Sequence, residues 1–118
     1  MKKITTLIAL FLFAVSVTAQ EKNKKMDMEV DGVCEMCKMR IEKAALGVKG
    51  VKYALWDIPT HKLTLIIDER KTDPMQIKTA LVAAGHDTKE LKATEEAYKK
   101  VMPCCKYRDD EVVKNHKN

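Results

Sequence analysis

The hydrophobic pattern of residues 26–93 changes its period several times, and this constrains the fold of the chain more than any other feature. Apolar side chains at every second position indicate half-buried strands, whereas apolar side chains three or four positions apart indicate amphipathic helices. On this basis we expect strands at 26–30, 51–57, 62–67 and, shorter, 88–92, and helices at 38–46 and 74–84.

The resulting order is strand-helix-strand-strand-helix-strand. It is typical of an α+β domain in which two halves form one four-stranded antiparallel sheet with both helices on one face. A domain of this size buries about 60 % of the surface of its unfolded chain. We therefore expect a self-sufficient domain at residues 26–92, preceded by a polar leader at 20–25 and followed by a C-terminal helical extension and tail at 93–118.

Residues 1–19 differ from the rest of the chain. Lys2 and Lys3 precede an apolar run that ends in the small residue Ala19. This pattern predicts a secretory signal peptide that is cleaved after about Ala19. The run is shorter than the roughly 20 apolar residues that span a bilayer. We therefore expect a periplasmic or secreted protein with no stable membrane insertion after cleavage.

The composition of the remaining chain excludes several function classes. Removing residues 1–19 from the 118 leaves 99 residues, and the loss of Lys2 and Lys3 leaves 20 basic residues against 17 acidic ones, a net charge of +3. A chain of 99 residues is too short for a two-domain enzyme with its own cofactor fold. The basic residues are spread among acidic ones and aromatic residues are few, so we expect no nucleic-acid binding.

Two thiols lie close together where the first strand leads into the first helix. Cys34 and Cys37 enclose Glu35 and Met36, and the positive end of the helix dipole favours thiolates at that place. Two sulfur ligands are too few for structural zinc, which requires four. They suit a soft ion, above all Cu(I), and by the same argument Hg(II), Ag(I) or Cd(II).

The surroundings of this motif resemble a known family. The resemblance rests on Val30-Asp31-Gly32-Val33-Cys34-Glu35-Met36-Cys37, Ile41-Glu42-Lys43-Ala44, Gly50-Val51 and Ala84-Gly85-His86-Asp87. The family is the heavy-metal-associated domain family of copper chaperones, copper ATPase domains and periplasmic mercury-binding proteins. The resemblance implies a ferredoxin-like fold, metal ligation by Cys34 and Cys37, and transfer of the ion by ligand exchange to a metal transporter or another metal-binding protein.

The late loop differs from the usual family pattern, because His86 stands where an aromatic residue or lysine is common. In the family fold this loop lies beside the metal loop, so the resemblance makes His86 a possible third ligand or a residue that tunes the thiolate charge. The alternative is a solvated loop histidine.

Cys104 and Cys105 are adjacent and lie outside the family domain. A disulfide between adjacent residues is strained and is a poor structural staple. Three interpretations remain open. The pair can supply further sulfurs to a metal ion, it can be disulfide-linked to itself or to Cys34 and Cys37, or it can consist of free thiols without a set role.

The sequence therefore favours a binding protein that carries or scavenges a soft metal ion, and we expect no enzymatic activity. Two alternatives are a thiol-disulfide redox protein, since CxxC is also a redox pair, and a disulfide-stapled interaction domain. Cu(I) is the first candidate ion and Hg(II) the second.

Overall fold

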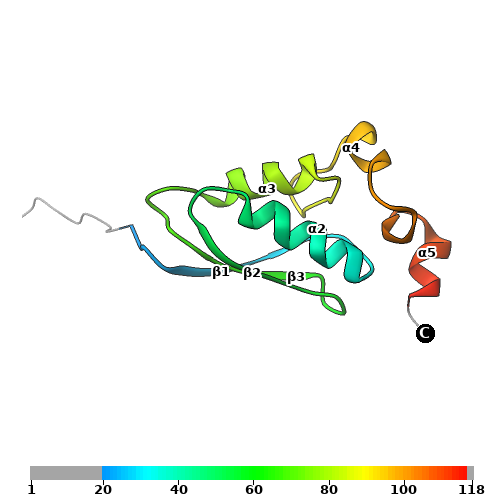
Figure 1. Cartoon of the computed structure of the whole chain (residues 1–118), viewed down its shortest axis with the longest axis horizontal. Coiled ribbons are helices and arrows are strands. Elements are labelled where there is room, and N and C mark those ends of the chain that lie inside the picture. The colour runs from blue at the N-terminus through cyan, green and yellow to red at the C-terminus, as the bar shows by residue number, and fades with distance from the viewer. Residues whose placement is uncertain (1–19, 117–118) are drawn as a thin grey trace, which may run out of the picture.

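The computed structural model describes residues 20–116, and the signal peptide predicted at 1–19 lies outside the described residues. Figure 1 shows the arrangement of the elements. In chain order they are β1 (Lys24–Glu29), α2 (Glu35–Leu46), β2 (Val51–Asp57), β3 (Lys62–Ile67), α3 (Pro74–Ala83), α4 (Glu95–Lys99), the 3₁₀ helix η2 (Pro103–Cys105) and α5 (Asp110–Asn115). Within residues 20–116, no helix has the length and apolar character needed to cross a membrane.

The sheet has the strand order β1-β3-β2, and both pairs are antiparallel. Leu63 on the central strand stands opposite Met28 on β1 and Trp56 on β2. Helices α2 and α3 lie together on one face of this sheet (Figure 1). The expected helix-on-sheet α+β architecture is therefore present.

The prediction of a fourth strand at 88–92 is wrong, because the described residues form a three-stranded sheet. Thr88 makes only an isolated antiparallel bridge with Val30. The reason is local. The Thr88 N–H donates to the Leu91 carbonyl at 2.8 Å, and its hydroxyl oxygen accepts from the Leu91 N–H at 2.9 Å. These bonds close a turn, so the segment bends back before a ladder can form.

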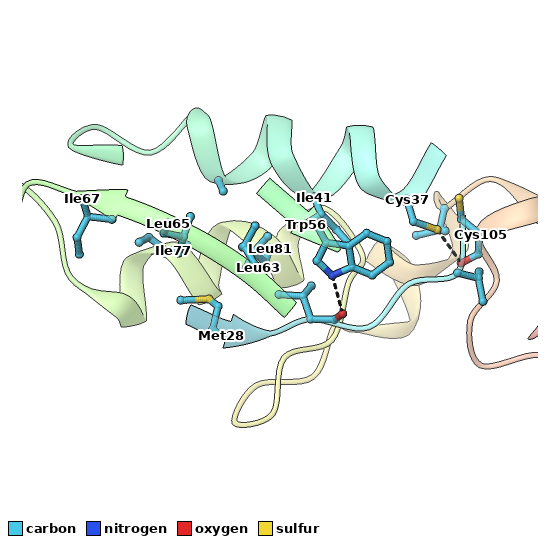
Figure 2. Close-up of a cluster of buried hydrophobic side chains, with 14 residues drawn as sticks. Met28, Cys37, Ile41, Trp56, Leu63, Leu65, Ile67, Ile77, Leu81 and Cys105 are labelled. Carbon is cyan, nitrogen blue, oxygen red and sulfur yellow. Dashed lines mark hydrogen bonds between the residues drawn. The ribbon is translucent and has the colours of Figure 1, made fainter. Parts of the chain in front are cut away.

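The core lies between the sheet and the two helices. Its side chains come from every second position of the strands and from one stripe of each helix (Figure 2). The fully buried members include Ile41, Ala45, Trp56, Leu63, Leu65, Ile77 and Leu81.

Trp56 connects this core to the loop that carries Cys34. Its indole N–H donates to the Val30 carbonyl at 3.0 Å, as the dashed line in Figure 2 shows. Gly32 packs against the same ring, and a Cβ added at Gly32 would lie 2.9 Å from Trp56 Cη2. Only glycine fits there without a shift, so the ring fixes how the chain approaches Cys34.

We predict that Trp56→Phe destabilises the protein while its neighbour Leu55→Ala does not. The Phe variant leaves the buried Val30 carbonyl without its donor, which costs about 1–3 kcal/mol. Leu55 points to the opposite face of β2 and is 45 % exposed. Urea unfolding of both variants measures the difference, and equal midpoints would show that the indole hydrogen bond is not required.

Candidate metal centre

Cys34 and Cys37 occupy different positions at the start of α2. Cys34 is the N-cap residue, with extended backbone angles (φ −143°, ψ 178°) and no side-chain capping hydrogen bond. Cys37 lies in the first turn and is fully buried, on the same helical stripe as Ile41 and Ala45. The two sulfurs are 3.6 Å apart.

The surroundings of the two thiols push their pKa values in opposite directions. Burial opposes ionisation of Cys34, but hydrogen bonds from the Cys105 thiol, the Cys37 N–H and the Cys37 thiol outweigh it and lower the pKa of Cys34. For Cys37, burial is the largest influence and raises its pKa. The expected activation by the helix start therefore acts on Cys34 and not on Cys37, and the Cys105 thiol lowers the pKa of Cys34 more than any single backbone N–H of the helix does.

The C-terminal extension brings two more sulfurs to the same place. Cys105 Sγ lies 3.0 Å from Cys34 Sγ, Cys104 Sγ lies 4.0 Å from it, and the two tail sulfurs are 3.8 Å apart. Figure 2 shows Cys37 and Cys105 meeting where α2 begins. Among residues 20–116, Cys34, Cys104 and Cys105 are the group whose candidate ligand atoms all lie within 4.8 Å of one another.

All four cysteines are free thiols in the structure. The exposure of the tail pair is unequal, because Cys104 is exposed whereas Cys105 is fully buried. A shallow surface hollow lined by Cys34, Met36, Cys104 and His116 opens this cluster to solvent. The structure therefore combines the four sulfurs in one cluster, and the interpretation of Cys104 and Cys105 as further metal ligands stays a prediction.

Polar contacts hold the tail against the late loop of residues 85–87. The Tyr107 hydroxyl donates to the Gly85 carbonyl at 2.6 Å and accepts from the Asp87 N–H at 3.0 Å. Arg108 Nη2 donates to the Asp87 carboxylate at 2.8 Å and to the Ala93 carbonyl at 2.9 Å.

The backbone of Gly85 is also part of this docking. It has φ +97°, and an added Cβ would lie 2.5 Å from Val101 Cγ2 and 2.8 Å from the Ala97 carbonyl oxygen. Glycine at this position therefore allows the positive φ of the turn, and its lack of a Cβ leaves room for the extension to pack closely.

His86 is fully buried, so the expectation of a solvated loop histidine is wrong. Its Nδ1 is 2.9 Å from the Asp31 carbonyl oxygen, and its ring stacks on Tyr107 with centroids 5.6 Å apart. Nε2 has no hydrogen-bond partner among the described residues. Burial lowers the pKa of His86 and favours the neutral ring. His86 lies outside the group of Cys34, Cys104 and Cys105, and its metal-ligating role stays a prediction.

Sequence reasoning missed the residues that anchor the tail. Tyr107 and Arg108 lie two and three positions after Cys105, but their partners Gly85 and Asp87 lie 20 to 22 positions earlier in the chain. Neither residue belongs to a periodic pattern. The sequence shows only that a tyrosine and an arginine lie close to two cysteines in a short tail. This does not indicate which residues of the domain they contact.

Comparisons with known proteins identify the family and the fold of the domain that carries Cys34 and Cys37. The family model described as heavy-metal-associated domain matches residues 27–87. The structure of the CopZ metallochaperone is 26 % identical, with coverage of 55 % of this chain and 98 % of that chain and a TM-score of 0.53. For the N-terminal soluble domains of Bacillus subtilis CopA the values are 28 % identity, 59 % and 48 % coverage, and 0.52.

A third solved structure shares the fold. Oxidized MerP from Ralstonia metallidurans CH34 is 24 % identical, with 56 % of this chain and 93 % of that chain covered and a TM-score of 0.54. No curated protein matched the chain. The matched family region ends at residue 87, before Cys104 and Cys105.

We predict that the Asp87–Arg108 pair makes the protein lose stability in acid. Burial opposes ionisation of Asp87, but hydrogen bonds from Arg108 and the Ala93 N–H hold the pKa of Asp87 below its ordinary value. A carboxylate whose pKa is lower in the folded protein than in the unfolded chain stabilises the folded state. This stabilisation is complete above the pKa of the unfolded chain, about 3.9, and is lost as the pH falls through the pKa of the folded protein. Asp87→Asn should therefore lower stability at pH 7 and flatten its decline between about pH 5 and pH 2.

Urea unfolding across this pH range tests the prediction, with Asp110→Asn as the control because Asp110 is an exposed carboxylate on α5. If Asp87→Asn and the wild type declined equally, the pair would not be the source of the acid sensitivity.

Proposed function

Because the chain belongs to the heavy-metal-associated domain family, we propose that it is an exported protein that binds a soft heavy-metal ion and carries or scavenges it. The observation that carries the proposal is the pair of Cys34 and Cys37 sulfurs, 3.6 Å apart at the start of α2 and inside the matched region. The description of CopZ as a metallochaperone supports the carrier role. The proposal assigns binding and transfer to the chain, without catalysis.

Thiolate chemistry supports Cu(I) as the first candidate ion and Hg(II) as the second. Soft sulfur ligands in small number select Cu(I) over the harder divalent ions. The lowered pKa of Cys34 favours the thiolate that a soft ion requires. Cys37 loses its proton when the metal–sulfur bond forms, since metal binding to thiols releases protons.

Transfer by ligand exchange follows from the unequal exposure of the two thiols. Cys34 is partly exposed and Cys37 is fully buried. An entering thiolate from a partner reaches the ion from the side of Cys34 and bonds to it before the old bonds break. Cys37 then releases the ion last. The partner is a metal transporter or another metal-binding protein that offers such a thiolate.

A second candidate function is thiol-disulfide exchange. It is favoured by the 3.0 Å separation of Cys34 Sγ and Cys105 Sγ together with the lowered pKa of Cys34. A thiolate next to a second thiol is the arrangement that forms and breaks disulfides.

We expect that residues 20–118, kept reduced under anaerobic conditions, take up Cu(I) stoichiometrically, and that Cys34→Ser and Cys37→Ser each weaken binding by about a hundredfold or more, which corresponds to about 2.7 kcal/mol. Titration against a chromophoric Cu(I) chelator measures the affinity, and elemental analysis measures the metal content. Glu35→Gln is the matched control, because Glu35 lies between the two cysteines and carries no sulfur.

A wild-type protein that left Cu(I) and Hg(II) with the chelator would contradict metal carriage. Turnover in an insulin-reduction assay by the same sample would favour the redox alternative.

A further inference from the structure

The sulfur nearest to Cys34 comes from outside the matched family region. That region ends at residue 87, yet Cys105 Sγ is 3.0 Å from Cys34 Sγ, closer than Cys37 Sγ at 3.6 Å. Cys37 Sγ also lies 4.0 Å from the Cys105 carbonyl oxygen. The C-terminal extension therefore reaches the two cysteines of the CxxC motif directly.

Cys105 is placed as a structural part of the site and is not a surface thiol. It is fully buried, whereas the adjacent Cys104 is exposed. The residues that follow it are fixed by side-chain hydrogen bonds, from Tyr107 to Gly85 and from Arg108 to Asp87. These contacts use no sulfur, so they hold the position of Cys105 independently of any bond among the thiols.

The distances suit a shared ion. Three sulfurs in a plane around one ion, each at the ~2.3 Å of a metal–thiolate bond, are separated by about 4.0 Å. The separations from Cys34 to Cys37 and Cys105 are 3.6 Å and 3.0 Å. Each of these two separations must therefore lengthen by about 1 Å or less for its pair of sulfurs to share an ion.

We propose that Cys105 is a third metal ligand, so that the C-terminal extension completes a three-sulfur site with Cys34 and Cys37. This inference rests on the proposed metal-binding function. When the ion binds, the S–H bonds of Cys34, Cys37 and Cys105 break, and their protons pass to solvent. Three metal–sulfur bonds form while the ion leaves the ligands that delivered it, and neither the ion nor the sulfurs change oxidation state.

The third sulfur changes how the ion is released. In a two-sulfur site an entering thiolate can bond to the ion directly. Here Cys105 occupies that coordination position, and the entering thiolate must displace it. Cys105 of the extension therefore takes the coordination position that a partner's thiolate would otherwise occupy, and this slows the loss of the ion.

The adjacent cysteines provide a matched pair of variants for the test. In residues 20–118, reduced and anaerobic, Cys105→Ser is expected to weaken Cu(I) binding by about tenfold or more, or about 1.4 kcal/mol. It should also speed transfer of Cu(I) to a chelator. Cys104→Ser removes the more distant and exposed sulfur of the same group, 4.0 Å from Cys34 Sγ, and should weaken binding less, by about threefold at most, or about 0.65 kcal/mol. Glu35→Gln, which removes no sulfur, is the control that should match the wild type.

X-ray absorption at the copper edge of the loaded wild-type protein gives a second readout that needs no variant. Three sulfur neighbours in the wild type and two in Cys105→Ser support the proposal. Two sulfur neighbours in the wild type overturn it, as does unchanged affinity in Cys105→Ser or an equal loss in Cys104→Ser. Circular dichroism of the metal-free variants checks that each is folded.

The same experiment separates this inference from the proposed function. If the wild type takes up no Cu(I), the proposed function fails. If the wild type binds Cu(I) through two sulfurs and Cys105→Ser matches it, the carrier function stands and only the role of Cys105 is wrong.

Discussion

The loop of residues 85–87 determines the geometry of the sulfur cluster, because it contacts both segments that supply the sulfurs. On one side, the Asp87 carbonyl accepts the Asp31 N–H at 2.9 Å, which holds the start of the CxxC loop. On the other side, the Asp87 carboxylate receives hydrogen bonds from Arg108 at 2.8 Å and 3.3 Å. A single residue thus connects the two segments, and the position of Cys105 depends on it more than on contacts between sulfurs.

The sequence predicts those parts of the fold that depend on regular burial. The strands at 51–57 and 62–67 and the helix that begins at Pro74 occur as expected, because each has one buried stripe against a shared core. The strand expected at 88–92 fails, because Thr88 bonds within its own turn and local hydrogen bonding overrides a weak alternation. Hydrophobic periodicity indicates which side chains are buried, but it does not reveal a side-chain hydrogen bond such as that between Thr88 and Leu91.

The site is predictable only in part, for a different reason. Cys34 and Cys37 follow from spacing and from the start of a helix. The approach of Cys105 does not, because it depends on anchors distant in sequence, such as Arg108 on Asp87. The unequal pKa directions of Cys34 and Cys37 also depend on tertiary burial, which a helix-dipole argument leaves out. One motif thus contains an activated thiol and a buried one.

The extension is held by side-chain hydrogen bonds as well as by apolar burial, whereas the domain core is held mainly by apolar burial. The core depends on fully buried apolar side chains such as Trp56 and Leu63. The tail combines hydrogen bonds from Tyr107 and Arg108, each worth about 0.5–1.5 kcal/mol net, with the burial of Val101 and Cys105 against the core. Detaching the tail therefore breaks these hydrogen bonds and exposes the two buried side chains. Because these contacts keep the buried thiol of Cys105 at the site, the proposed third ligand and the proposed release of an ion oppose each other, and under that proposal the strength of the contacts sets the balance.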